Sequence, residues 1–295
     1  MAKKKSKLLR RLPLVGIFML LISGLGLLMY PIVGNWYTEY TSYVAISRYD
    51  NDVQKAGTAA IKRFEQLANE YNRALARNEE DKLSVTDYDS MLAVSDSIAY
   101  IEIPKIGVYL PVYHGLSDDV LQKGIGHMEG TSLPVGGEST HCVLAGHTGL
   151  PSAKIFTDLD LMNMGDAFYV HVLDKVMKYE VDRIQTVLPD DLSGIMIEDG
   201  EDYVTLLTCT PYGINSHRLL VRGRRVPYYT QTMENTDPWP VYHASEEKIP
   251  VRTIVWYGGA GTTGAVIIIA ILILVLPGRK KRKNKVGKTE ENKEQ

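Results

Sequence analysis

Charged residues are absent from two long stretches of this 295-residue chain. Neither residues 12–38 nor residues 253–278 include an Asp, Glu, Lys or Arg. Each stretch exceeds the roughly 20 apolar residues that cross a bilayer, so the sequence predicts transmembrane helices at 12–36 and 253–278. With 45% hydrophobic and 23% charged residues the chain can bury a core, so disorder is not its expected state.

Basic residues are gathered at the two ends, in tails at 1–11 and 279–295. The positive-inside rule therefore predicts a two-pass protein of the cell membrane, with both termini cytoplasmic and the middle outside. A cleaved signal peptide or a buried core helix is the alternative for the first span, but that run exceeds an h-region of roughly 7 to 15 residues and no cleavage site follows. The second span could be the sorting signal of a wall-attached protein, yet no Leu-Pro-X-Thr-Gly motif precedes it.

Between the tails, basic residues are scarce. Of the 33 Lys and Arg residues 14 lie in the tails, against 3 of the 35 Asp and Glu residues, which leaves the rest with a net charge of −13. This acidity argues against a nucleic-acid partner.

Cysteine is scarce too, with only Cys142 and Cys209. In an oxidising environment a disulfide between them and a free reactive thiol are both allowed. No histidine has a metal-ligand spacing to a second His or Cys, so a metal site is not expected. Packing or hydrogen-bonding roles are therefore assigned to His114, His127, His141, His171, His217 and His243.

Residues 37–98 are expected to form an extracellular helix and loop. Apolar residues recur at three- and four-residue steps over 47–77, which predicts an amphipathic helix that packs on the domain. Residues 78–97 are acidic and weakly patterned, which predicts a loop with one helical turn near 89–94.

From residue 99 the pattern is that of short strands. Runs rich in Val, Ile, Leu, Tyr and Thr alternate with Gly, Pro and Asp, which predicts a mostly-β domain over 99–228, an antiparallel sheet closed or curled into a barrel. Prolines and aromatic residues at 229–252 predict a linker to the second span. The expected strands are 100–112, 142–145, 167–173, 177–187, 203–208 and 217–224.

Three side chains with complementary chemistry lie at strand ends. Cys209 follows an apolar strand, His147 follows another, and Arg218 begins the strand after Cys209. A thiolate can attack a carbonyl, an imidazolium can protonate a leaving amine, and a guanidinium can stabilise an oxyanion. If 203–208 and 217–224 pair as a hairpin, Cys209 and Arg218 can point into one cleft. A lone Cys or His is more often a packing residue, so a non-catalytic surface domain is an alternative.

Residues 205–223 (TLLTCTPYGINSHRLLVRG) resemble the signature of class C, pilin-polymerising sortases. The resemblance extends over about 100–224, and the two flanking anchors also suit that class. It includes YIEIPK at 100–105, LPVYHG at 110–115, GHMEGTSLPVGG at 126–137 and LAGHTGLP at 144–151.

This resemblance implies an eight-stranded β-barrel, no cofactor, and a cysteine transpeptidase of Gram-positive cells with weak thiol protease (hydrolase) activity. Cys209 is then the nucleophile, His147 the general acid and base, and Arg218 the oxyanion stabiliser. The enzyme would cleave an LPXTG-like motif between Thr and Gly, hold a thioester on Cys209, and transfer it to a lysine of a pilin subunit in pilus assembly. Anchoring of surface proteins to cell-wall peptidoglycan is the alternative.

One expected feature of class C is missing before the barrel. The family usually carries an Asp-Pro-aromatic lid there, but no proline occurs between Pro31 and Pro104. The sequence therefore predicts an open cleft, with a degenerate lid at 87–89 or closure by Trp239 as alternatives. Cys142 is expected to be buried on its strand.

Overall fold

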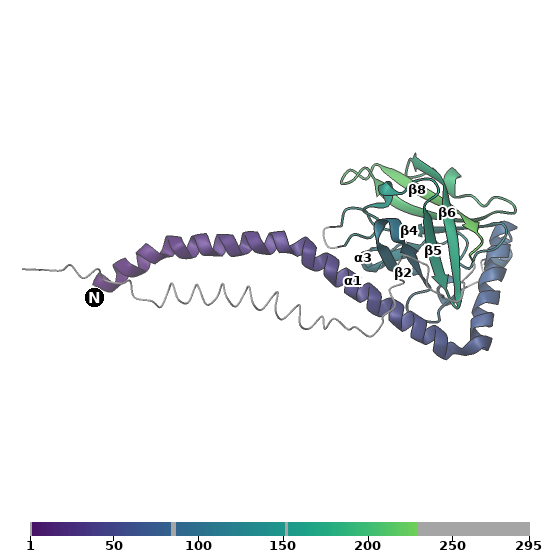
Figure 1. Ribbon diagram of the computed structural model, residues 1–295, viewed down its shortest axis with the longest axis horizontal. Helices are drawn as coiled ribbons and strands as arrows, with labels where there is room; N and C mark the ends of the chain where they lie inside the picture. Colours follow the sequence, from purple (N-terminus) through teal and green to yellow (C-terminus); the bar gives the residue numbers. More distant parts are fainter. Residues whose placement is uncertain (1, 84–86, 151–152, 229–295) are drawn as a thin grey trace, which may run out of the picture. The chain divides into compact units, whose positions relative to one another are not determined.

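The computed structural model describes residues 2–83, 87–150 and 153–228, which form a long N-terminal helix and a β-barrel (Figure 1). The predicted linker at 229–252, the second predicted span at 253–278 and the basic tail at 279–295 lie outside the described residues.

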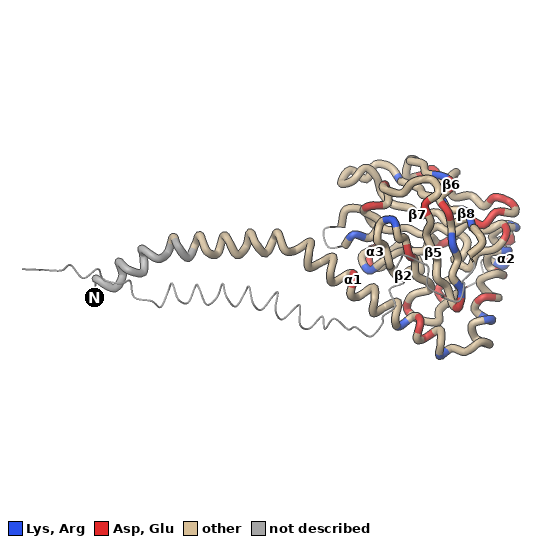
Figure 2. The backbone as a smooth tube through the Cα atoms, in the orientation of Figure 1, with Lys and Arg blue, Asp and Glu red and all other residues tan. Residues whose placement is uncertain are grey.

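Helix α1 (Ala2–Ala76) begins the chain, and from Gly16 onward it is long and apolar enough to cross a membrane. Its uncharged part is the tan run in Figure 2. The helix is broken at Gly57, where φ is 76° and ψ is 160°. The expectation of one unbroken helix over 47–77 is therefore wrong at this residue, because glycine has no Cβ and is almost alone in adopting that backbone conformation.

The last part of α1 packs on the barrel, as the amphipathic pattern predicts. Ile61, Ala68 and Tyr71 belong to the buried core cluster. The amide of Asn72 exchanges two hydrogen bonds with the backbone of Leu133, at 2.7 and 3.1 Å. Because a buried amide pair of this kind is costly to break, it fixes the helix against the barrel.

Eight strands close into a barrel in the order β1-β2-β3-β4-β7-β8-β6-β5, which confirms the predicted fold class. The expectation of an antiparallel sheet is wrong for two pairs, because β2–β3 and β4–β7 are parallel; the others are antiparallel. The strands are β1 (Ala99–Ile103), β2 (Val108–His114), β3 (Ile125–His127), β4 (Thr140–Ala145), β5 (Ala167–Val172), β6 (Lys175–Val187), β7 (Asp202–Thr210) and β8 (His217–Val226).

The expected strand at 100–112 is in fact two strands. A 3-10 turn, η2 (Pro104–Ile106), separates β1 from β2, and Gly107 follows it with φ of 64°. The turn begins with a proline and ends with a glycine in the left-handed conformation. These two residues reverse the chain, so the apolar run that predicts one strand forms a hairpin of two. Residues 78–97 include two short helices, α2 (Glu80–Leu83) and η1 (Tyr88–Ser90), and turn residues follow at 91–94, so the turn expected near 89–94 is present and begins at Tyr88.

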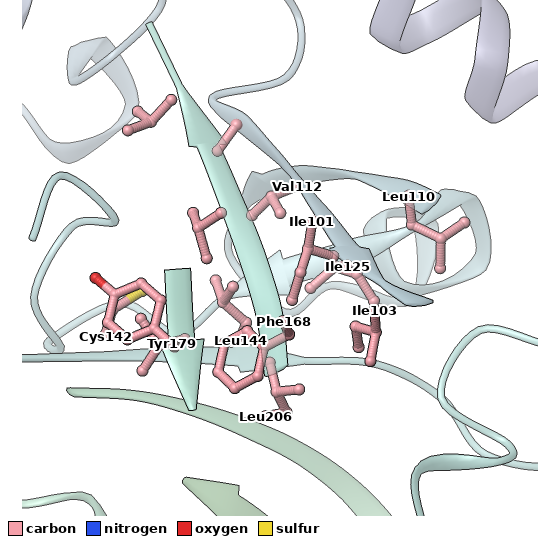
Figure 3. Packing of buried hydrophobic residues seen from close by; sticks show 14 of the residues in the cluster. Ile101, Ile103, Leu110, Val112, Ile125, Cys142, Leu144, Phe168, Tyr179 and Leu206 are labelled. Carbon is pink, nitrogen blue, oxygen red and sulfur yellow. The ribbon is translucent and has the colours of Figure 1, made fainter. Parts of the chain in front are cut away.

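The barrel interior is filled by alternate residues of its strands. Figure 3 shows Ile101, Val112, Leu144, Phe168 and Leu206 among them, and all five are fully buried. A Cβ on Gly223 would lie 2.5 Å from the ring of Phe168, so only glycine fits at that point of β8. A packed interior of this kind holds the strand ends rigidly.

One short helix and two 3-10 turns between strands complete the described secondary structure near the site. Helix α3 (Asp118–Lys123) joins β2 to β3 and is capped by Ser117, whose hydroxyl accepts from the N–H of Val120. The 3-10 turns η3 (Leu159–Leu161) and η4 (Ser193–Ile195) lie between β4 and β5 and between β6 and β7.

Candidate active site

Cys209 and Arg218 are brought together by the hairpin of β7 and β8. The two residues are directly opposed in the antiparallel register. Opposed residues of an antiparallel pair lie on the same face of the sheet, so both side chains face the same side. The hairpin expected from the sequence is therefore present.

His147 is brought to the same place by the parallel pairing of β4 with β7. The register places Ala145 beside Leu207, and the N–H of Gly146 donates to the carbonyl of Leu207 at 3.0 Å. Two residues further along, His147 lies level with Cys209. The hydroxyl of Thr208 donates to the carbonyl of Gly146 at 2.7 Å and fixes this end of β4.

Gly146 is required at this crossing. A Cβ there would lie 2.7 Å from the ring of Phe156 and 2.9 Å from the side chain of Ile125. Both neighbours are fully buried and have no room to move. The backbone before His147 therefore lies against the core, which fixes where the His147 side chain leaves the backbone.

The three side chains line one cleft of about 300 Å³. Apolar residues of β4, β6, β7, β8, α3 and the segment after β6 form most of its wall, which suits an extended peptide with an apolar side chain. The lining consists of Leu116, Leu121, Met128, Ala145, Gly146, His147, Val187, Pro189, Asp191, Leu192, Ile195, Leu207, Thr208, Cys209, Arg218 and Leu220.

The guanidinium of Arg218 is held by its own loop. Its Nη1 donates to the carbonyl of Asn215 at 3.2 Å and to that of His217 at 3.1 Å. Asn215 adopts a left-handed φ of 58°, which turns its carbonyl back toward β8. One edge of the guanidinium is thus fixed by the loop, and its remaining N–H groups are the ones that a substrate can meet.

Cys142 lies in a different environment from Cys209, and both are free thiols. Cys142 is 3% exposed among the core residues of β4, and burial raises the pKa of its thiol. A thiol whose pKa is raised in this way is a poor nucleophile. Cys142 is therefore a packing residue, and Cys209 is the cysteine that opens onto the cleft.

Four histidines outside the cleft have hydrogen-bonding partners. The ring of His141 contacts the carbonyl of Met196 at 2.8 Å and the hydroxyl of Thr205 at 2.7 Å. His171 contacts Glu102, and His217 contacts the Ser216 hydroxyl at 2.9 Å. The ring of His127 contacts the carbonyl of Ser132 and the hydroxyl of Tyr88. His114 packs edge-on against Tyr88, and His243 lies outside the described residues.

Sequence reasoning missed a buried contact between Tyr88 and His127. The Nε2 of His127 lies 2.9 Å from the carbonyl of Ser132, which can only accept, so this nitrogen carries the proton. The Tyr88 hydroxyl then donates to Nδ1 at 2.7 Å, and it accepts from the N–H of Gly115 at 3.3 Å. Burial raises the pKa of Tyr88 and lowers that of His127 to about 4.

This contact lies beside the cleft but not in it. Gly115 and His127 directly precede Leu116 and Met128, which line the cleft. Within 78–83 and 87–97, the described parts of the expected lid segment, no side chain belongs to the lining. Tyr88 belongs to the segment 87–89 that was the alternative lid. It is anchored to the barrel wall rather than laid over Cys209.

A second hollow, of about 410 Å³, lies at the opposite ends of β7 and β8. Asp202 and Arg225 line it, and Asp202 accepts from the N–H of Gly137 at 2.8 Å and from the hydroxyl of Tyr179 at 2.9 Å. These contacts join the strand ends and include no nucleophile. Across the described residues, no group of three His, Cys, Asp or Glu side chains is placed to hold a metal ion.

Comparison with known proteins relates the barrel domain to one family. The Sortase domain family matches residues 101–226, which include Cys209, His147 and Arg218. Sortase D of Bacillus subtilis is 30% identical over 129 residues, which cover 43% of this chain and 62% of that protein. The chain thus matches less than two thirds of this relative's length.

Solved structures match over a larger share of their length. The crystal structure of sortase C from Streptococcus pneumoniae is 48% identical, with a TM-score of 0.57 over 62% of this chain and 96% of that one. Sortase C from Clostridium perfringens, solved with the C-terminal cell wall sorting motif, is 43% identical, with a TM-score of 0.57 over 63% and 100%.

Proposed function

The chain belongs to the sortase family, and we propose that it is a membrane-anchored class C transpeptidase that joins pilin subunits. Its substrate is an LPXTG-like sorting motif, cut between Thr and Gly, and its acceptor is the amine of a pilin lysine. The observation that carries this proposal is the cleft shared by Cys209, His147 and Arg218. The similar Clostridium perfringens sortase C was solved with a sorting motif, which supports that substrate class.

In the first half of the reaction the Cys209 thiolate attacks the carbonyl carbon of the motif's Thr. A C–S bond forms, and the carbonyl π electrons move to oxygen. The N–H groups of Arg218 donate to this oxyanion, beside the carbonyls that hold its Nη1. The C–N bond to Gly then breaks as the His147 imidazolium gives its proton to the leaving nitrogen, which leaves a thioester and a neutral imidazole.

In the second half a lysine amine attacks the thioester carbon. The C–N bond forms, the imidazole of His147 takes a proton from the attacking nitrogen, and the C–S bond breaks to return the thiolate. The product is an isopeptide bond, and the thiolate and imidazolium are restored. Water in place of the amine gives hydrolysis, the weak peptidase activity.

A membrane location is supported by the aromatic residues of α1. Trp36 and Tyr40 stack with ring centroids 6.0 Å apart, and Tyr37 is exposed beside them. Aromatic residues of this kind are enriched at the membrane–water interface. They follow the apolar run of α1, as expected for a catalytic domain held outside the membrane by an N-terminal anchor.

The proposal is tested by incubating the full-length protein in detergent with a sorting peptide and measuring its mass. We expect an acyl adduct on Cys209 that is absent from the Cys209→Ala variant. Offering the adduct a lysine peptide from a pilin or a peptidoglycan stem peptide then separates polymerisation from wall anchoring. An unmodified Cys209 with every peptide would contradict transpeptidase activity.

A further inference from the structure

The sheet face that carries the active site continues beyond it along β7 and β8. Alternate residues of paired strands lie on one face, so two further pairs follow the catalytic one. The first, Leu207 with Leu220, lines the cleft. The second, Thr205 with Arg222, is polar and buried. A buried polar layer therefore adjoins the apolar part of the cleft on the same face of the sheet.

The segment after β6 lies on this face. A Cβ on Gly194 would clash with the side chains of Gln185 and Leu220, so the backbone of the segment is packed directly against the sheet. Leu192 and Ile195, on either side of this contact, line the cleft. The position of this cleft wall is thus set by the contacts that join the segment to the sheet.

His141 of β4 makes one of these contacts, and its side chain is fully buried. Its Nδ1 lies 2.8 Å from the carbonyl of Met196, which can only accept, so this nitrogen carries the proton. Its Nε2 then accepts from the hydroxyl of Thr205 at 2.7 Å. Burial lowers the pKa of His141, so the ring is neutral at neutral pH. Because Met196 follows Ile195, this bond fixes the backbone beside a residue of the cleft wall.

Arg222 makes a second contact two residues further along the segment. Its Nη1 donates to Glu198 at 2.8 Å, and its Nε and Nη2 donate to the two oxygens of Asp182 at 3.0 and 2.8 Å. The guanidinium carbon lies 3.8 Å from the ring centroid of Tyr203. Because a buried charge is costly unless it is paired, Arg222 holds Glu198 against β6 and β7.

The two contacts are directional. A hydrogen bond requires its partner at about 3 Å and near a fixed angle, whereas an apolar contact tolerates sliding. A satisfied polar layer therefore specifies one position of the segment on the sheet, and with it the distance from the cleft wall to Cys209. Neither His141 nor Arg222 is among the described residues that line the cleft.

We propose that His141 and Arg222 are positioning residues for the sorting motif, because they hold the wall after β6 where an extended peptide fits beside Cys209. This inference rests on the proposed function and extends it to two residues outside the cleft. Both act through the wall and not on the reacting atoms. Their loss should weaken binding of the peptide equally before and in the transition state, so KM rises and kcat is little changed.

The test measures steady-state cleavage of a sorting peptide by the full-length protein in detergent. Two amide substitutions separate the two hydrogen bonds of His141. The amide of His141→Asn reaches the place of Nδ1 and can still donate to Met196, whereas the longer amide of His141→Gln reaches the place of Nε2 and Thr205. We expect KM to rise about fivefold in His141→Gln, as for loss of one hydrogen bond, and by less than about twofold in His141→Asn.

A role of His141 in stability alone predicts a different pattern. Thr205→Val leaves Nε2 without its partner and should lower the free energy of unfolding, yet it keeps the bond to Met196, so KM should be little changed. Urea unfolding measures the stability of each variant. A small thiol reagent should label Cys209 at the same rate in all of them, because the nucleophile is not moved.

Glu198→Gln tests the second contact at a side chain that is 47% exposed, where folding is not at stake. It removes the charge that pairs with Arg222 and should raise KM about threefold, as for an exposed ion pair. Glu201→Gln is the matched control. It removes the ion pair with Arg224, which has the same length of 2.8 Å, and should leave KM unchanged.

Three results at His141 would overturn the inference while the proposed function stands. These are an unchanged KM in His141→Gln, an equal rise in His141→Asn, or an equal rise in Thr205→Val. If His141→Gln does not fold, equal KM values in Glu198→Gln and Glu201→Gln would overturn it instead. Failure of the unaltered protein to form any thioester on Cys209 would overturn the proposed function and the inference together.

Discussion

Cys209 and Arg218 are directly opposed residues of the antiparallel pair β7 and β8. Their shared face depends on register, because a slip of one residue would turn one of the two side chains to the other face. Eight residues separate them in the chain, six of them in the loop at 211–216, yet the pairing makes them neighbours at the mouth of the cleft. The first two predictions follow from this relationship.

Replacing Cys209 with Ala is expected to abolish turnover of a sorting peptide, whereas Cys142→Ala keeps most of it. Cys142 is buried and its thiol pKa is raised, so its loss should cost only about 1 kcal/mol of folding free energy. Peptide cleavage followed by chromatography measures the first effect, and thermal unfolding the second. Equal loss of turnover from both substitutions would mean that the nucleophile is misassigned.

Arg218→Lys is expected to be nearly as damaging as Arg218→Ala. The guanidinium uses Nη1 on two loop carbonyls and offers its other N–H groups to an oxyanion, which a single ammonium cannot do at once. We expect kcat to fall roughly 10²–10³-fold in both variants, as for loss of an oxyanion donor. Steady-state kinetics with a sorting peptide measures kcat of both variants. A near-normal kcat in the Lys variant would mean that Arg218 contributes only a positive charge.

Tyr88→Phe should lower the free energy of unfolding by roughly 1–3 kcal/mol, because it leaves Nδ1 of His127 and the N–H of Gly115 without their partner. Since Leu116 and Met128 follow these two residues, KM for the sorting peptide should rise more than kcat falls. Urea unfolding and peptide kinetics measure the two effects. Tyr212→Phe, at an exposed ring, is the control for stability, and equal stability of both variants would contradict the prediction.

Acid is expected to destabilise the barrel through His127. Its pKa is about 4 when folded against 6.5 ordinarily, so the unfolded chain binds the extra proton between these values. Stability is therefore fully present above pH 6.5 and falls by about 3 kcal/mol as pH drops to 4. His127→Gln should lack this part of the pH dependence. Urea unfolding of both proteins at several pH values measures this dependence. If the free energy of unfolding changed equally with pH in both proteins, His127 would be excluded as the cause.

Cys209 should react quickly with a small thiol reagent in the unaltered protein. The described parts of 78–97 do not line the cleft, so removing the Tyr88 ring should change the labelling rate less than about twofold. Trp239 lies outside the described residues, and Trp239→Ala tests it separately. An acceleration of about tenfold or more in either variant would show a working lid and refute the open cleft.

Much of the barrel and its site could be predicted because the strands and the hairpin are each encoded by a short, continuous stretch of sequence. The strand runs around Cys209 and Arg218 are long, and the loop between them is short enough for a hairpin. The resemblance of 205–223 to a known signature supplied the number of strands.

The remaining features depend on tertiary contacts that leave little local signal. Strand β3 has three residues, too few for an alternating pattern. Tyr88 lies in an acidic, weakly patterned segment, and its partner His127 is 39 residues away. Gly57 breaks α1 within a regular apolar repeat, where a single glycine is usually tolerated.

Because the barrel is closed, every strand already has a neighbour on both sides. The barrel therefore offers no free sheet edge to an incoming peptide. The peptide cannot add to the sheet as an extra strand, as it would in β-augmentation. Selection must come from side chains that fit the apolar wall and from groups at the strand ends. The same closure protects the barrel strands from being drawn into intermolecular sheets.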